Sequence, residues 1–95
     1  MELTREVRAV LARNWVKTEY LDYSVIGGTV YLRGIFEVGG GEQKGDNPFA
    51  EAACAIRKIE DEFKHLKDIN GIIWNIDNWE KRGSGWFCMK TGKFY

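Results

Sequence analysis

The feature that most constrains the fold is a run of alternating apolar and polar residues that Gly27-Gly28 interrupts. Apolar side chains recur at even spacing on both sides of the glycines: Leu21, Tyr23 and Val25 before them, and Val30, Leu32, Phe36 and Val38 after them. A period of two indicates strands with one buried face. Paired glycines supply the positive φ angles that a tight hairpin turn needs. The sequence therefore predicts a β-hairpin over residues 20–38.

Two amphipathic helices are predicted on either side of this hairpin. The first runs from about Thr4, a plausible N-cap, to Trp15, with apolar positions Leu3, Val7, Val10, Leu11 and Trp15. The second runs from Pro48 to about Lys67, with Asn47 as its N-cap. Its apolar stripe steps by four, three, four and three: Ala52, Ile56, Ile59, Phe63 and Leu66.

A third strand is expected at residues 72–79, after Asn70-Gly71 ends the second helix. The order is then α-β-β-α-β. Because each helix has one apolar stripe, both should cover the same face of a three-stranded mixed sheet, which gives an α+β two-layer sandwich. A single domain over residues 1–80 is followed by a tail, residues 81–95, in which no clear period is visible.

Residues 27–37 (GGTVYLRGIFE) and 69–79 (INGIIWNIDNW), with the predicted element order, resemble the BON domain (bacterial OsmY and nodulation) over about residues 3–80. The resemblance implies a membrane-associated or scaffold-binding module, with phospholipid attachment as the usual proposed role and no catalytic residues. The chain departs from the family in its longer Gly-rich connection at 39–47, one extra residue in the last strand, and a single copy without a leader.

Charge and composition weigh against several classes of function. The chain has 14 basic and 14 acidic residues, so a general nucleic-acid binder, which needs excess Lys and Arg, is not expected. No apolar run is long enough to span a bilayer, and the N-terminus does not have the pattern of a signal peptide. We therefore expect a cytoplasmic location, or the envelope or periplasm if an upstream leader has been removed.

Residues that could support catalysis or bind a cofactor or metal are few. His65 is the single histidine and is expected to be exposed on the second helix, as is Cys54, while Cys88 stands alone in the tail. The Gly-rich segment lacks the Gly-Lys-Ser/Thr of a phosphate loop. The charges around Glu60-Asp61-Glu62 are typical of ion pairs on a solvated helix. We expect no enzyme activity, no cofactor and no metal.

The candidate interaction surface is apolar and basic. If Val30, Leu32 and Phe36 face the helices, the opposite face of the sheet carries Tyr31, Ile35, Ile73 and Trp79. The tail contributes Lys81, Arg82, Trp86, Phe87, Lys90 and Lys93, and residues 81–95 have a net charge of +4. This tail suits either an anionic membrane surface or a flap that covers the open sheet face, and the flap is favoured.

Three functions follow from these observations. The first is a non-catalytic module that attaches to a protein partner or an anionic phospholipid surface through the sheet face and the tail. The second is a structural module that forms a homodimer through its sheet faces. The third is a small-ligand carrier or enzyme that uses the Gly-rich loop.

Overall fold

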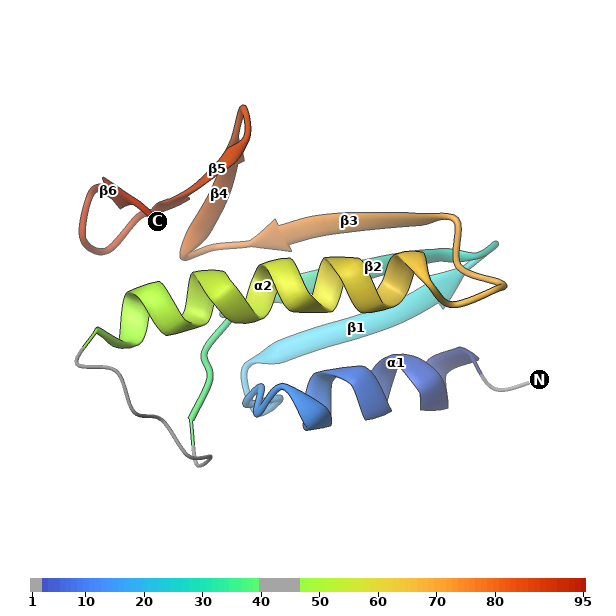
Figure 1. Cartoon of the computed structure of the whole chain (residues 1–95). Coiled ribbons are helices and arrows are strands. Elements are labelled where there is room, and N and C mark those ends of the chain that lie inside the picture. The colour runs from blue at the N-terminus through green and yellow to red at the C-terminus, as the bar shows by residue number, and fades with distance from the viewer. Residues whose placement is uncertain (1–2, 40–46) are drawn as a thin grey trace.

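The computed structural model describes residues 3–39 and 47–95, and all structural statements below refer to these two ranges. They form an α+β fold with two helices and two three-stranded sheets (Figure 1). The elements are α1 (Leu3–Arg13), β1 (Leu21–Ile26), β2 (Thr29–Gly34), α2 (Pro48–Lys64), β3 (Gly71–Ile76), β4 (Trp79–Arg82), β5 (Gly85–Cys88) and β6 (Lys93–Phe94). Neither of the two helices has the length and hydropathy needed to cross a membrane.

The first sheet is mixed, as the sequence predicts. Its strand order is β1-β2-β3, with β1 antiparallel and β3 parallel to β2. The hairpin between β1 and β2 is confirmed, because Gly27 and Gly28 have φ angles of 57° and 83°. These positive values match a primed hairpin turn, which twists in the same sense as the strands it joins.

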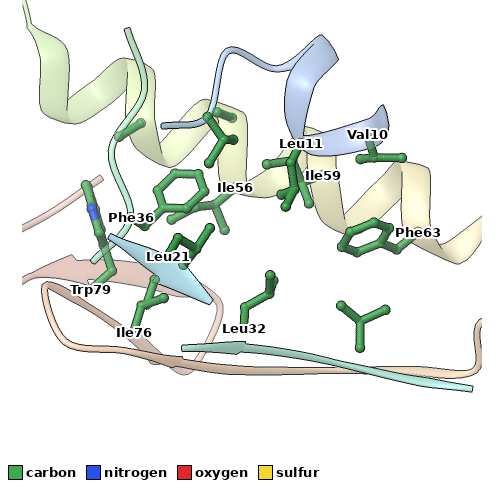
Figure 2. Close-up of a cluster of buried hydrophobic side chains, with 14 of the residues drawn as sticks. Val10, Leu11, Leu21, Leu32, Phe36, Ile56, Ile59, Phe63, Ile76 and Trp79 are labelled. Carbon is green, nitrogen blue, oxygen red and sulfur yellow. The ribbon is translucent and has the colours of Figure 1, made fainter. Parts of the chain in front are cut away.

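Both helices pack on one face of this sheet, and a second three-stranded sheet, which the predicted order α-β-β-α-β did not include, follows them in the chain. Figure 2 shows side chains of α1 and α2 directed toward Leu21 and Leu32 of the sheet. Val30 and Leu32 are fully buried beneath the helices. The hydrophobic core therefore lies between the helix layer and the sheet, and neither α1 nor α2, the helices of the described residues, lies on the other face.

The predicted ends of the helices need correction. Helix α1 already includes Leu3, so Thr4 is not its N-cap, and it ends at Arg13. Trp15 then takes a positive φ of 59° and is 55% exposed, so it does not extend the apolar stripe. In α2 the Asn47 cap is confirmed, because its side-chain oxygen accepts hydrogen bonds from the backbone N–H groups of Phe49 and Ala50 at 3.0 and 3.2 Å. This helix ends at Lys64, three residues before the predicted end.

The predicted strand 72–79 is in fact two strands separated by a bend at Asp77 and Asn78. The Asn78 side chain fixes the bend by pairing with the backbone of Phe36. Its Oδ1 accepts from the Phe36 N–H at 3.0 Å, and its Nδ2 donates to the Phe36 carbonyl at 2.8 Å. After the bend the alternation of inward and outward side chains starts again at Trp79.

Residues 79–95 form the antiparallel sheet β4-β5-β6, although no period was recognised in the tail, residues 81–95. A series of ring contacts joins it to the rest of the core. Trp74 meets Phe36 at a centroid distance of 5.8 Å and Trp86 at 5.5 Å, both edge to face. Tyr95 contacts Trp79 at 5.7 Å and Phe49 of α2 at 6.3 Å. The tail therefore packs against α2 and the core, and the expected flap over the open sheet face is wrong.

Candidate interaction surface

The first sheet has one face that neither helix covers, called the open face below. Tyr31 lies near its centre, in register with Ser24 of β1 on one side and Ile73 of β3 on the other. Ile73 is 42% exposed and Ile35 is 39% exposed, whereas Tyr31 is half-buried. The structure thus places three of the four predicted face residues on this side of the sheet.

The open face also includes Ile26, which the sequence analysis missed. Ile26 is 66% exposed at the end of β1, beside the hairpin glycines. Alternation along β1 puts Leu21, Tyr23 and Val25 toward the helices, so Ile26 belongs to the opposite side. The alternation along β1 is the signal in the sequence that indicates this side for Ile26.

Charges on the open face are balanced. Asp22, Arg33 and Asn75 form one row across the three strands, because Asp22 is paired with Arg33 and Arg33 with Asn75 in the strand register. Opposite charges placed directly across neighbouring strands attract each other. This row gives the open face both an acidic and a basic group rather than an excess of either.

The prediction that Trp79 lies on the open face is wrong. Trp79 is only 4% exposed, and it lies opposite Cys88 in the β4–β5 register. The reason is the bend at Asp77 and Asn78, which resets the alternation that the prediction carried through from β3. Trp79 is a core residue that connects the two sheets.

The basic-aromatic tail is only partly a free surface. Trp86 is buried and Phe87 is half-buried. Lys81 forms an ion pair with Glu60 at 3.4 Å and lies over the Trp86 ring at 5.9 Å. Arg82 pairs with Glu80 and stacks 4.0 Å above the Phe87 ring. Two of the four tail cations are thus engaged within the fold.

The other two cations have a different environment. Lys90 and Lys93 are exposed, and within the described residues neither makes an ion pair. Met89, beside Lys90, and Phe94, beside Lys93, are 51% and 57% exposed. The turn between β5 and β6, with β6 itself, therefore presents both apolar and cationic side chains.

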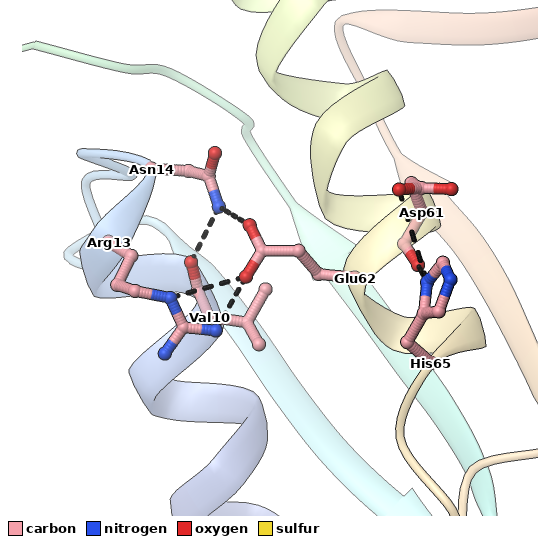
Figure 3. A network of polar contacts seen from close by, with 6 residues as sticks. All are labelled: Val10, Arg13, Asn14, Asp61, Glu62 and His65. Atoms are coloured by element: carbon pink, nitrogen blue, oxygen red, sulfur yellow. Dashed lines mark hydrogen bonds and ion pairs between the residues drawn. The ribbon is translucent and has the colours of Figure 1, made fainter.

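The acidic residues of α2 do more than the sequence suggests. Glu60 accepts hydrogen bonds from the Trp74 indole N–H at 3.1 Å and from Lys81, so it ties α2 to β3 and β4. Glu62 accepts from Asn14 at 2.8 Å and pairs with Arg13, as Figure 3 shows. These hydrogen bonds, from Asn14 first and then Arg13, lower the pKa of Glu62 below its usual value of 4.5. The expectation that these carboxylates form ion pairs only along the solvated surface of α2 is wrong, because their partners lie on other parts of the chain.

The remaining candidates do not assemble into a reactive centre among the described residues. His65 is exposed, and its Nδ1 lies 2.7 Å from the Asp61 carbonyl oxygen. Cys54 is exposed and Cys88 is buried, both as free thiols. No group of three potential metal ligands occurs in the described part of the chain. The Gly-rich segment 40–46, on which the ligand-carrier hypothesis depends, lies outside the described residues.

Comparison with protein-family models, with curated proteins and with solved structures finds no match to this chain.

Proposed function

We propose that this chain is a non-catalytic protein-binding module that docks its partner on the open face. The observation that carries the proposal is the set of exposed isoleucines, Ile26, Ile35 and Ile73, around Tyr31 on a sheet face without a helix layer. An exposed apolar patch with a polar rim is characteristic of an interaction site. A binding module is also what the resemblance to the BON family implies.

The charges on this face favour a protein over an anionic membrane. Binding to an anionic bilayer gains about 1 kcal/mol for each Lys or Arg near the surface. On the open face, however, Arg33 is matched by Asp22 on the neighbouring strand. Mixed charges around an apolar centre suit a protein surface, on which complementary groups can fix the orientation of the partner.

The size of the face argues against a homodimer formed by stacking two open faces. Three strands about 4.8 Å apart, with six residues at about 3.3 Å each, cover roughly 280 Å². A stable interface needs about 800 Å² from each partner. The partner must therefore contact more of the module than the open face alone.

A second candidate function is attachment to an anionic lipid surface through the β5–β6 turn and β6. The observation that favours it is the combination of exposed Met89 and Phe94 with the unpaired Lys90 and Lys93. Apolar side chains can enter the interface while the lysines approach the phosphates. This surface is separate from the isoleucines that carry the first proposal.

Paired aspartate substitutions distinguish the two functions. In the first proposal, Ile73→Asp abolishes retention of a specific protein from cell extract, while Phe94→Asp leaves it unchanged. The retained protein is then purified and its binding is remeasured by calorimetry. For the lipid candidate, co-sedimentation with phosphatidylglycerol vesicles is lost in Phe94→Asp and kept in Ile73→Asp. If the purified partner still binds the Ile73→Asp variant, the first proposal is contradicted.

A further inference from the structure

Within residues 3–39 and 47–95, no strand pairs with the outer edge of β3. In the first sheet β3 pairs with β2 on one side only. The N–H of Asp77, just after β3, donates to the Gly34 carbonyl of β2 at 2.7 Å. The backbone N–H and C=O groups of successive residues point to alternate sides of a strand, so the backbone groups of Ile73 and Asn75 also point to β2. The backbone groups of Ile72, Trp74 and Ile76 therefore point away from β2, to the open edge.

No other part of the described chain satisfies these outward groups. Among the backbone and side-chain hydrogen bonds of the described residues outside the strand ladders, none involves the main chain of Ile72, Trp74 or Ile76. Unpaired N–H and C=O groups in a row are a template for another extended strand. The chemistry that fits this edge is thus a peptide backbone.

The surface beside this edge is hollowed along its length. One hollow, of about 370 Å³, is lined by Glu60, Phe63 and Lys64 of α2 and by residues 69–72. A second, of about 490 Å³, is lined by residues 74–77, by β4 and by Met89. Lys81 lines both hollows, so they adjoin at its side chain. Together they follow β3 from one end to the other.

The two ends of this groove carry opposite charges. Lys64 lines the hollow at the Gly71 end, and Asp77 lines the hollow at the opposite end. Both side chains are exposed, and neither makes an ion pair within the described residues. Between them, the cation Lys81 is already matched by Glu60. The groove is therefore complementary to a segment with one acidic and one basic end.

We propose that the partner adds an extended segment of about six residues antiparallel to β3. Its basic end, near its N-terminus, lies beside Asp77, and its acidic end lies beside Lys64. Antiparallel pairing is the more stable of the two strand directions. Every second side chain of the added strand points to the same side of the sheet as Ile73, which enlarges the open face. This inference rests on the proposed protein-binding function and supplies part of the contact area that the open face lacks.

The test uses the full chain labelled with ¹⁵N and the peptide acetyl-Lys-Thr-Val-Thr-Val-Glu-amide. Added peptide is expected to slow hydrogen exchange at the N–H groups of Ile72, Trp74 and Ile76, which are unpaired in the free protein. Ile73 and Asn75, already bonded to β2, change little. Binding in the millimolar range is expected for so short a strand.

Charge reversal tests the direction of the added strand. The double variant Lys64→Glu/Asp77→Lys is expected to prefer acetyl-Glu-Thr-Val-Thr-Val-Lys-amide by about fivefold, the effect of two exposed ion pairs. The matched control Lys67→Glu/Asp68→Lys changes two exposed residues that line neither hollow and keeps the original preference.

Three outcomes would overturn strand addition at β3. They are no protection of the three amides at about 5 mM peptide, equal affinity of both peptides for every variant, or protection that increases with protein concentration without peptide. The last would show that a second copy occupies the edge. If the peptide does not pair with the edge of β3 but Ile73→Asp still abolishes partner binding, only the strand addition is wrong and the proposed function stands.

Discussion

The side-chain amide of Asn14 donates a hydrogen bond to the Glu62 carboxylate at 2.8 Å and joins the end of α1 to α2. The same Asn14 nitrogen lies 2.8 Å from the Val10 carbonyl, and Arg13 donates from its Nε to Glu62 at 3.2 Å. Two residues that follow each other in the sequence therefore hold one carboxylate 48 residues away. These contacts hold the C-terminal end of α1 against α2.

Stability is expected to depend on pH through Glu62. Its pKa in the folded state lies below the usual 4.5, so the ionised form is favoured by folding. The stabilisation is complete above pH 4.5 and is lost as the pH falls through the lowered pKa. Glu62→Gln should cost about 1 kcal/mol or less at pH 7, because the site is partly exposed, and the cost should be smaller at pH 3, where more of the wild-type carboxyl is protonated. Urea unfolding at both pH values measures this, with Asp68→Asn, at an exposed residue that makes no ion pair within the described residues, as the control that changes neither value.

Asn78→Ala is expected to destabilise the fold by about 2 kcal/mol, because it leaves the N–H and C=O of Phe36 without partners. Phe36 is buried, so water cannot easily replace the lost amide. Thermal unfolding followed by circular dichroism measures the change. Asn75→Ala, at an exposed position three residues earlier, should shift the midpoint by less than a quarter as much.

Gly34→Ala is expected to be among the most damaging single substitutions, with a loss of about 3 kcal/mol or more. A Cβ at this position would lie 2.2 Å from the Tyr20 carbonyl oxygen, and the φ angle is +110°. Gly27→Ala is the matched comparison, because φ is +57° there but a Cβ would meet no atom within 4 Å. It should cost about 1 kcal/mol. Equal losses in the two variants would show that the close approach to Tyr20 does not matter.

Trp86→Ala should remove about 3–5 kcal/mol of stability, as expected for a large buried ring that is truncated. Because Trp86 packs against Trp74 of the first sheet, unfolding should remain a single transition with a lower midpoint. Denaturant titrations followed by both fluorescence and circular dichroism test this. A variant in which the second sheet unfolds separately would contradict it. Phe94→Ala, at an exposed ring, should cost less than about 1 kcal/mol.

The first sheet and α2 could be predicted from sequence because their signals are local. The Gly27-Gly28 turn, the alternation around it and the Asn47-Pro48 helix start each depend on neighbouring residues. The same alternation located Tyr31, Ile35 and Ile73 on the open face. These signals need no knowledge of which segments meet in space.

The second sheet was missed because its strands are too short to show a period. β4 and β5 have four residues each and β6 has two. Their inward positions, such as Trp86, are defined by contact with Trp74 and not by spacing along the chain. The sequence predicted the wrong face for Trp79 because the bend before this residue depends on hydrogen bonds between Asn78 and Phe36, which is distant in the sequence. The roles of Glu60 and Glu62 likewise come from residues on other elements.

The ring contacts between the two sheets give the protein an optical signal of its own. The ring centroids of Trp74 and Trp86 lie 5.5 Å apart, with an angle of 78° between the ring planes. Trp15, which follows the end of α1, is 55% exposed and lies outside this pair. Electronic transitions of two indoles at this separation couple, and the coupling is strongest for their intense far-ultraviolet transition, so the pair should add a distinct band to the far-ultraviolet circular dichroism spectrum. Trp74 belongs to β3 and lines the hollow beside its edge, so a segment that joins this edge is expected to change the band, which needs neither a dye nor an isotope.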